Sequence, residues 1–134
     1  MKKYQVIEHT ADLKIKVFAR TKKELFSNFL LALSEILVRE KGGKKVKRNI
    51  EVHSFDFPAL LVDFLNQVIF LSQTNKEFYD KIQIKEFSEK KIKGFLFGRK
   101  IERFKEDIKA ATYHDLKVEK DEDNNWQAVI LFDI

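Results

Sequence analysis

Cysteine is absent from this 134-residue chain, which excludes disulfides, thiolate zinc sites, cysteine nucleophiles and iron–sulfur clusters. Glycine occurs four times and proline once, so long helices and strands joined by short turns are expected. The sequence also lacks the glycine-rich phosphate and dinucleotide loops, the serine-hydrolase elbow and the zinc-protease motif. These absences exclude the enzyme classes that such short motifs identify.

Long apolar runs are missing as well. The longest mostly apolar segment, residues 60–71, is interrupted by Asp63 and Asn66 and is shorter than the roughly 20 residues that a membrane span requires. The apolar residues that follow Lys3 are broken at Glu8, which is unlike a signal peptide. We therefore expect a cytoplasmic protein with no membrane segment.

The residues that are present describe one compact domain. Hydrophobic residues make up 44% of the chain and include thirteen phenylalanines, enough for a single core spanning residues 1–134. The 26 basic and 21 acidic residues give a net charge of +5. This charge is compatible with a nucleic-acid partner, but lysines spread over exposed faces are also an ordinary means of solubility, so both interpretations stay open.

Periodicity and capping residues predict nine elements in the order β-β-α-β-α-β-β-β-β. Residues 13–17 alternate apolar with charged side chains, as a half-buried strand does. Thr21 and Glu24 form a capping box before the first helix, and Asp56 caps the second, whose first turn tolerates Pro58. This order predicts an α+β fold: a two-layer sandwich of a mostly antiparallel sheet with both helices on one face. The expected segments are 4–8, 13–17, 21–39, 46–55, 56–72, 78–87, 92–101, 110–119 and 126–132.

Carboxylates at the end of the last strand indicate a cation site. Asp133 is followed by Ile134, the final residue, so its side chain lies beside a free α-carboxylate. Two adjacent negative charges require a neutralising group, and hard cations such as Ca²⁺ and Mg²⁺ prefer oxygen ligands. Asp12 is the candidate for a third carboxylate, which requires its strand to neighbour the last strand. The alternative is an exposed chain end paired with lysine.

Four segments together resemble the archease family of small proteins that assist the RNA-splicing ligase RtcB. The resemblance covers the whole chain. The segments are 7–12 (IEHTAD), 60–66 with 70–71 (LLVDFLN and FL), 108–114 (IKAATYH) and 129–134 (VILFDI).

The resemblance implies a fold built on a strand-helix-strand-strand module with an insertion, and a protein that activates the ligase without being an enzyme itself. It implies that the protein promotes GTP-dependent guanylylation of the ligase and repeated turnover in joining tRNA halves. It maps a divalent metal site, for Ca²⁺ or alternatively Mg²⁺ or Mn²⁺, onto Asp12, Asp133 and Ile134. Further candidates, for supporting the metal site or docking the partner, are His9, Asp63 and His114.

Two positions depart from the family pattern. Lys14 replaces a glycine close to the metal site, where its ammonium group would compete with a divalent ion if it folded toward the oxygens. Asp115 replaces the glycine that follows the histidine of the 112–114 motif, and a left-handed backbone conformation is costlier for aspartate than for glycine.

The alternative function is a basic RNA-binding module in tRNA or RNA processing. The basic stretches 45–48 and 90–93 lack interleaved aromatic residues, so they resemble solvated strand edges, and any RNA binding is expected to be weak and electrostatic. We expect no DNA partner. A metal-dependent hydrolase would need a general base at the metal, and His9 is the sole candidate.

Overall fold

The computed structural model describes residues 2–8, 12–38 and 42–134. Nine elements follow one another in the order that the sequence predicts. Within these residues, no helix is long and apolar enough to cross a membrane. The elements are β1 Tyr4–Glu8, β2 Asp12–Ala19, α1 Lys22–Leu37, β3 Lys45–His53, α2 Phe57–Asn75, β4 Glu77–Ser88, β5 Lys91–Lys100, β6 Ala110–Lys120 and β7 Trp126–Asp133.

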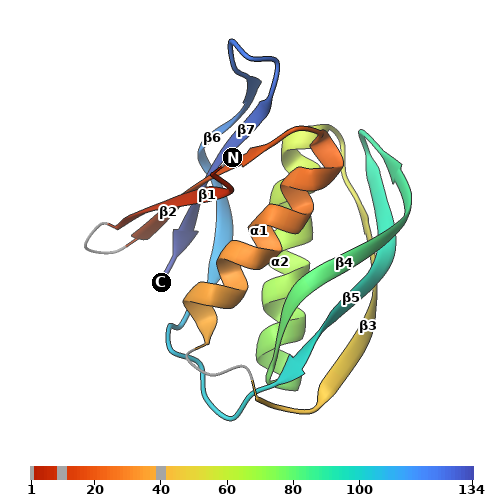
Figure 1. Ribbon diagram of the computed structural model, residues 1–134, viewed down its shortest axis with the longest axis vertical. Coiled ribbons are helices and arrows are strands. Elements are labelled where there is room, and N and C mark those ends of the chain that lie inside the picture. The colour runs from red at the N-terminus through yellow and green to blue at the C-terminus, as the bar shows by residue number, and fades with distance from the viewer. Residues whose placement is uncertain (1, 9–11, 39–41) are drawn as a thin grey trace.

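The strands form two antiparallel sheets, in the orders β1-β2-β7-β6 and β3-β5-β4. Both helices lie between the sheets and contact strands of each (Figure 1). The predicted α+β class, with two helices and antiparallel strands, is confirmed. The layers are sheet, helices, sheet, where the sequence predicted one sheet layer and one helix layer. The reason is visible in α2, whose consecutive residues Leu60, Leu61 and Val62 are all buried; because successive residues are about 100° apart around a helix, one sheet cannot cover them all.

The chain builds two similar modules, one inside the other. The elements β3-α2-β4-β5 form a strand-helix-strand-strand module whose first strand pairs with its last. This module is inserted between α1 and β6 of an outer module, β2-α1-β6-β7, in which the first strand also pairs with the last. The expected module with an insertion is therefore present. Its consequence for function is that β7 returns beside β2 and joins residues from opposite ends of the chain.

Side-chain caps start both helices where the sequence predicts. The Glu24 backbone N–H donates to the Thr21 hydroxyl at 3.2 Å, and the Ala59 N–H donates to the Asp56 carboxylate at 2.9 Å. Each bond satisfies one of the amide groups left open at a helix start. At the other end, α2 stops at Lys76, which adopts a left-handed conformation with φ 53° and turns the chain directly into β4.

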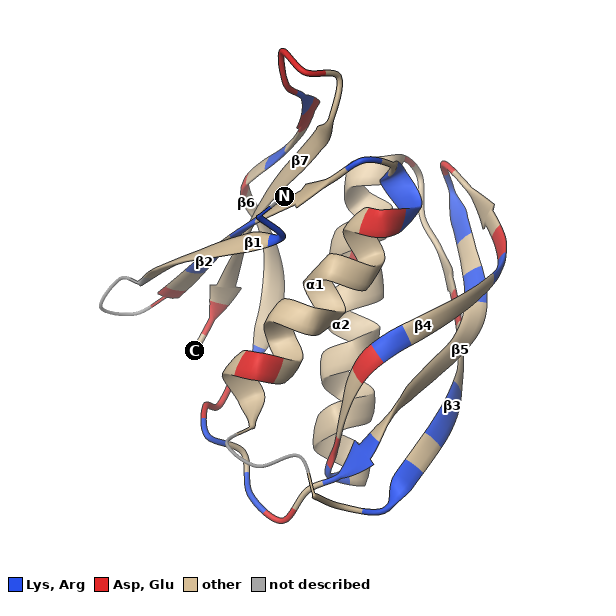
Figure 2. Ribbon diagram, viewed as in Figure 1, with Lys and Arg blue, Asp and Glu red and all other residues tan. Residues whose placement is uncertain are grey.

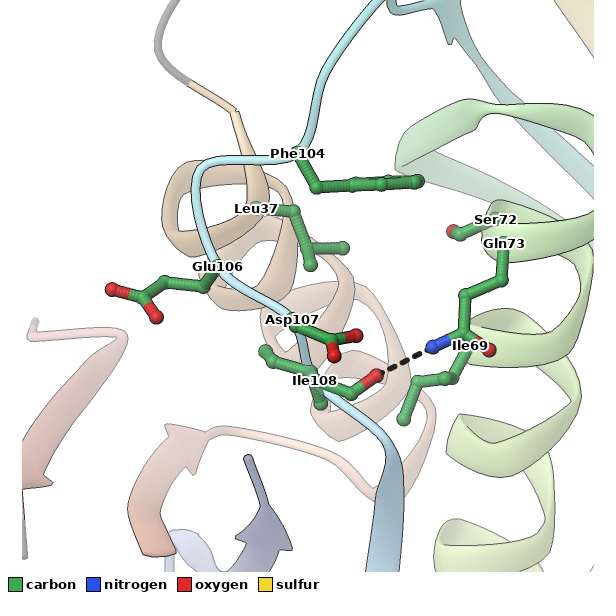
Figure 3. Close-up of a pocket in the computed structure, with 8 residues that line it drawn as sticks. All are labelled: Leu37, Ile69, Ser72, Gln73, Phe104, Glu106, Asp107 and Ile108. Carbon is green, nitrogen blue, oxygen red and sulfur yellow. Dashed lines mark hydrogen bonds between the residues drawn. The ribbon is translucent and has the colours of Figure 1, made fainter. Parts of the chain in front are cut away.

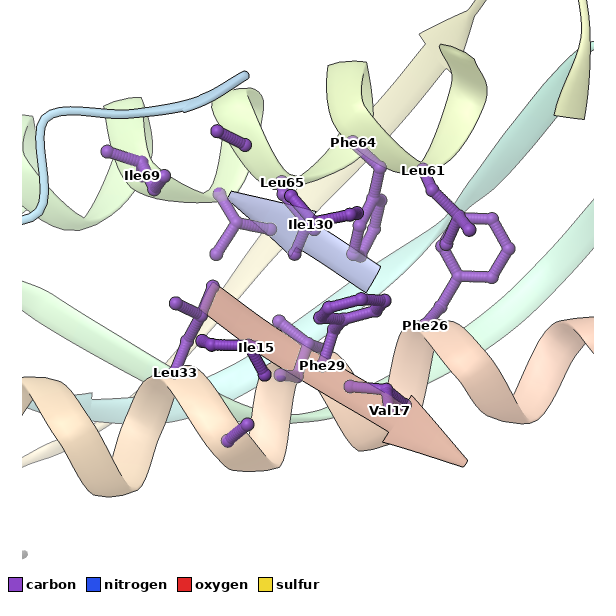
Figure 4. Packing of buried hydrophobic residues seen from close by; sticks show 14 of the residues in the cluster. Ile15, Val17, Phe26, Phe29, Leu33, Leu61, Phe64, Leu65, Ile69 and Ile130 are labelled. Carbon is purple, nitrogen blue, oxygen red and sulfur yellow. The ribbon is translucent and has the colours of Figure 1, made fainter. Parts of the chain in front are cut away.

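Phenylalanines from the two helices meet in the centre of the core. The rings of Phe26 on α1 and Phe64 on α2 pack edge to face with centroids 5.0 Å apart, and Ile15 and Ile130 of the four-stranded sheet lie beside the helices (Figure 4). Truncating such a buried phenylalanine to alanine typically costs about 3–5 kcal/mol. The inner face of each sheet is thus committed to packing, and the outer faces are available for function.

Candidate functional site

Asp12 and Asp133 face each other across neighbouring strands. Asp12 begins β2, Asp133 ends β7, and the two are direct partners in the antiparallel register. This confirms the predicted adjacency of their strands. Leu13 and Phe132 are buried against the helices, so alternation places both carboxylates on the outer face of the sheet. Side chains directly opposite each other have Cβ atoms about 4.5–5.5 Å apart.

Neither aspartate of this acid pair forms a salt bridge with another described residue. The Oδ1 atom of Asp12 is buried and has no hydrogen-bond partner there. Lys14 shares the outer face, opposite Leu131, yet forms no ion pair with either aspartate among the described residues.

The backbone at Asp133 is held by neighbouring strands on both sides. Asp133 pairs with Asp12 on one side and with Ala110 on the other, and its carbonyl accepts the Lys109 N–H at 2.8 Å. Ile134 follows it and is 38% exposed. A strand residue held in this way presents its carboxylate at a defined position, which is what a metal ligand requires.

The donor set fits a hard cation but is incomplete without a third oxygen ligand. The described residues contain no cluster of three or more His, Cys, Asp or Glu side chains that could hold a metal. Asp12 and Asp133 supply two carboxylates, and one of their oxygens, Oδ1 of Asp12, is buried with no hydrogen-bond donor among the described residues. His9 lies outside the described residues.

Asp63 occupies a different place from the acid pair. Its carboxylate accepts a hydrogen bond from the Ser54 hydroxyl at 2.7 Å and another from the Tyr113 hydroxyl. The hydrogen bond to Asp63 is the main reason why the pKa of Tyr113 is raised to about 12, with burial adding to it. Asp63 thus fastens α2 to the loop before it and to strand β6.

Two further polar residues of α2, which the sequence analysis did not select, bind the chain leading into and along β6. The Asn66 amide donates to the Ala111 carbonyl at 3.0 Å and accepts from the Ala111 N–H at 2.8 Å. The Gln73 amide donates to the Ile108 carbonyl at 2.8 Å. Asp63, Asn66 and Gln73 lie on one side of this mostly apolar helix, a spacing that could have revealed them. Two of the four segments that resemble the archease family therefore meet in space.

His114 and Asp115 lie in an irregular part of β6. The register between β6 and β7 shifts between Thr112 and Lys117, and Asp115 has φ 55°. The position where the family pattern has glycine thus adopts a left-handed conformation here, which aspartate tolerates better than most residues. The His114 ring is exposed, with its Nε2 atom 3.4 Å from the Asp115 carboxylate.

A small cavity lies between the C-terminal ends of both helices and the chain leading to β6 (Figure 3). Its volume is about 20 Å³, and it is lined by residues that include Leu37, Ser72 and Ile108. The Ser72 hydroxyl is buried without a hydrogen-bond partner among the described residues. This space is close to that of one water molecule and is too small for a nucleotide or metabolite.

These features define a class of small α+β protein, in which two nested strand-helix-strand-strand modules bring an acid pair together on the outer face of a sheet, where its two central strands meet. The family model described as the archease protein family (MTH1598/TM1083) matches residues 4–134. The chain belongs to the archease family.

Relatives and solved structures agree with this assignment. The chain is 33% identical to the archease of Methanosarcina mazei, over 99% of this chain and 97% of the relative, and 34% identical to that of Pyrococcus abyssi over the full length of both. The solution structure of Methanobacterium thermoautotrophicum protein 1598 matches all of both chains with a TM-score of 0.79 at 25% identity. A crystal structure of a Thermotoga maritima archease, described as a possible chaperone, shares the fold with a TM-score of 0.69 at 23% identity, over 97% of this chain and 96% of the other.

Proposed function

We propose that this protein activates an RtcB-type RNA-splicing ligase in the cytoplasm. In this proposal it promotes GTP-dependent guanylylation of the ligase and allows repeated turnover in tRNA exon joining. The support is membership of the archease family over nearly the whole chain, together with the ordered acid pair of Asp12 and Asp133. The description of the Thermotoga maritima protein as a possible chaperone is consistent with a protein that acts on another protein.

The acid pair is the proposed working site. Asp12, Asp133 and the terminal carboxylate of Ile134 would hold a divalent ion, Ca²⁺ in the first instance and Mg²⁺ or Mn²⁺ as alternatives. Such an ion supplies positive charge and coordination positions that an oxygen ligand of the partner can fill. The two aspartates present their carboxylates on the outer face of the sheet, where a docking protein can reach them.

The chemistry of ligation is assigned to the ligase. The polar groups around Asp63 are engaged in hydrogen bonds that hold α2 to its neighbours, and the cavity beside Ser72 has room for about one water. We therefore propose that, in activating the ligase, this protein binds and rearranges the ligase itself, and that this role requires tRNA only as the substrate of the ligase and no DNA or membrane partner.

A ligation assay with limiting ligase, excess nicked tRNA and GTP tests this proposal. Wild-type protein should raise the number of ligation events per ligase molecule, while Asp12→Asn should lose that effect and the matched exposed variant Asp80→Asn should keep it. Ligation or GTP hydrolysis by the protein alone, or the absence of any effect on the ligase, would contradict the proposal.

Extension of the chain beyond Ile134 tests the contribution of the terminal carboxylate. An added residue converts that carboxylate into a neutral amide without altering the buried side chains of β7. Calcium affinity and ligase activation should fall together. A C-terminally extended protein that retains both would remove Ile134 from the proposed metal site.

A further inference from the structure

The outer face of the three-stranded sheet presents two phenylalanine rings on its central strand. In β5, Leu96 is fully buried against the helices, while Phe95 and Phe97 on either side of it are half-buried. Alternation along the strand directs both rings outward, about 7 Å apart along the chain. This spacing is close to that of neighbouring nucleotides in an extended single strand.

Polar side chains flank each ring on both sides. Phe97 lies between Lys47 of β3 and Lys81 of β4 in the register of the sheet. Residues directly opposite one another share a face, so this row consists of two ammonium groups around one aromatic ring. The row contains both of the groups that contact a nucleotide, namely a flat apolar ring for the base and cations for the phosphates.

The next row along the strand is built differently. Phe95 lies between Asn49 and Gln83, whose side-chain amides can both donate and accept hydrogen bonds. Groups of this kind bind the edges of bases. In the register of the sheet, lysines therefore lie on both sides of Phe97 and amides on both sides of Phe95.

The positive charge on this face is not neutralised nearby. Among the described residues, Lys45, Lys47 and Lys81 form no ion pair, although the exposed Asp80 directly precedes Lys81 within β4, where the register shifts. The Lys47 ammonium instead lies 4.2 Å from the centroid of the Phe95 ring. Figure 2 shows Lys and Arg along β3 and β5 where these strands approach the end of α2.

Two acidic residues of this face, Glu51 and Glu86, lie toward its other end and are paired. Glu51 lies 2.9 Å from His53 and 3.8 Å from Lys93, and Glu86 lies 2.6 Å from Lys91. The two rings thus lie where the face is most positive. The basic stretches themselves lack interleaved aromatic residues, as the sequence shows; the rings beside Lys47 come from the neighbouring strand β5.

We propose that this face binds single-stranded nucleic acid, with bases stacked on Phe95 and Phe97, phosphates held by Lys45, Lys47 and Lys81, and base edges within reach of Asn49 and Gln83. Aromatic residues on the central strands of a sheet serve in this way in single-strand binding domains. An acidic peptide would satisfy the lysines but would leave the rings and amides without a matching group. The site is separate from the proposed metal site and requires neither metal nor ligase.

Fluorescence anisotropy with a labelled 12-nucleotide RNA, titrated at several salt concentrations, tests the proposal. Phe95→Leu/Phe97→Leu keeps apolar bulk but removes the stacking surface, and should weaken binding about tenfold or more. Lys47→Gln should lower the slope of log affinity against log salt by about 0.7, the value for one phosphate contact on a single strand.

The outer face of the other sheet supplies matched controls. There the Lys16 ammonium lies 5.4 Å from the centroid of the Phe18 ring, so Phe18→Leu and Lys16→Gln make the same chemical changes outside the proposed site. Both should leave RNA binding unchanged. Circular dichroism and thermal melting should show that each variant is folded. Lys47→Glu leaves both rings in place and should also lose RNA binding. It replaces the double leucine variant as the test if that variant unfolds.

Several results would overturn the proposal. The proposal is wrong if the wild-type protein does not bind the RNA at low salt, or if the double leucine variant binds the RNA as tightly as the wild type. It is also wrong if poly-glutamate or heparin binds as tightly as the RNA and responds to the variants in the same way. The same titration is carried out with a single DNA strand of the same sequence and with a duplex. Tighter binding of RNA than of single-stranded DNA, or equal binding of the two, supports a single-strand site. Tighter binding of the duplex than of either single strand contradicts it. Failure here would leave the activator proposal intact, since no ligase is present.

Discussion

Replacing Asp12 with asparagine should have opposite effects on stability without and with calcium. Directly opposed strand residues have Cβ atoms about 5 Å apart, and two carboxylates with that separation between their charges repel by about 1–3 kcal/mol, depending on the effective dielectric constant. The amide of asparagine removes that repulsion and makes the buried Oδ1 position uncharged. In the presence of a chelator, Asp12→Asn should therefore be more stable than the wild type by about 1 kcal/mol, the lower end of that range.

The effect of calcium can be estimated in the same terms. A ligand at a hundred times its dissociation constant stabilises the folded state by about 2.7 kcal/mol. For a chain of this length, 1 kcal/mol corresponds to about 3.5 °C in melting temperature. Wild-type protein should therefore melt about 10 °C higher with saturating calcium, and Asp12→Asn should gain little, which reverses the order of the two proteins.

Differential scanning calorimetry of wild type, Asp12→Asn and the exposed control Asp80→Asn, each with chelator and with calcium, measures this reversal. Asp80→Asn should respond to calcium as the wild type does. Equal gains in wild type and Asp12→Asn would show that the ion binds elsewhere. A wild-type protein that is stabilised by none of calcium, magnesium or manganese would refute the metal site itself.

Three further predictions concern other groups. Glu77 is fully buried and receives two hydrogen bonds from Arg48, which lower its pKa below the ordinary value of 4.5; Glu77→Gln should cost about 2 kcal/mol at neutral pH in urea unfolding. Because a lowered pKa stabilises the folded state above 4.5 and that stabilisation is lost as the pH falls through the lowered value, the difference should shrink in acid. Asp63→Asn should move the pKa of Tyr113 from about 12 toward 10, as followed by phenolate absorbance, and an unchanged titration would contradict the assigned hydrogen bond. Asp115→Gly should raise stability by up to about 1 kcal/mol, since glycine adopts a positive φ freely, and a lower urea midpoint would count against it.

The secondary structure could be predicted closely because its signals are local. Thr21 and Asp56 cap the helices through bonds to residues only three positions away. Alternation over 13–17 likewise depends on the strand's own residues. The division into two sheets depends instead on which surfaces of α1 and α2 are covered, and a linear pattern of apolar residues does not show that both sides of a helix require cover.

The candidate sites differ in the same way. The acidic end of the last strand and the resemblance to the archease family together predict Asp12 and Asp133 as site residues, and in the register of β2 and β7 they lie opposite each other. The row of Lys47, Phe97 and Lys81 could not be predicted from sequence spacing, because it depends on the pairing of three strands and on a register shift in β4. Cross-strand sites of this kind are defined by register, and register is a property of the assembled sheet.

The position of the helices also separates the two proposed sites energetically. The acid pair lies on the outer face of one sheet and the Phe95 and Phe97 rings lie on the outer face of the other, with a helix layer about 10 Å thick between them (Figure 1). Sites this far apart, with no shared partner, should change stability additively to within about 0.5 kcal/mol, so a double variant Asp12→Asn/Lys47→Gln should show the sum of the two single effects in unfolding experiments. If the same double variant departs from additivity in a ligation assay, the coupling must come through a partner that contacts both faces, because additive unfolding energies would show that the folded protein itself does not connect them.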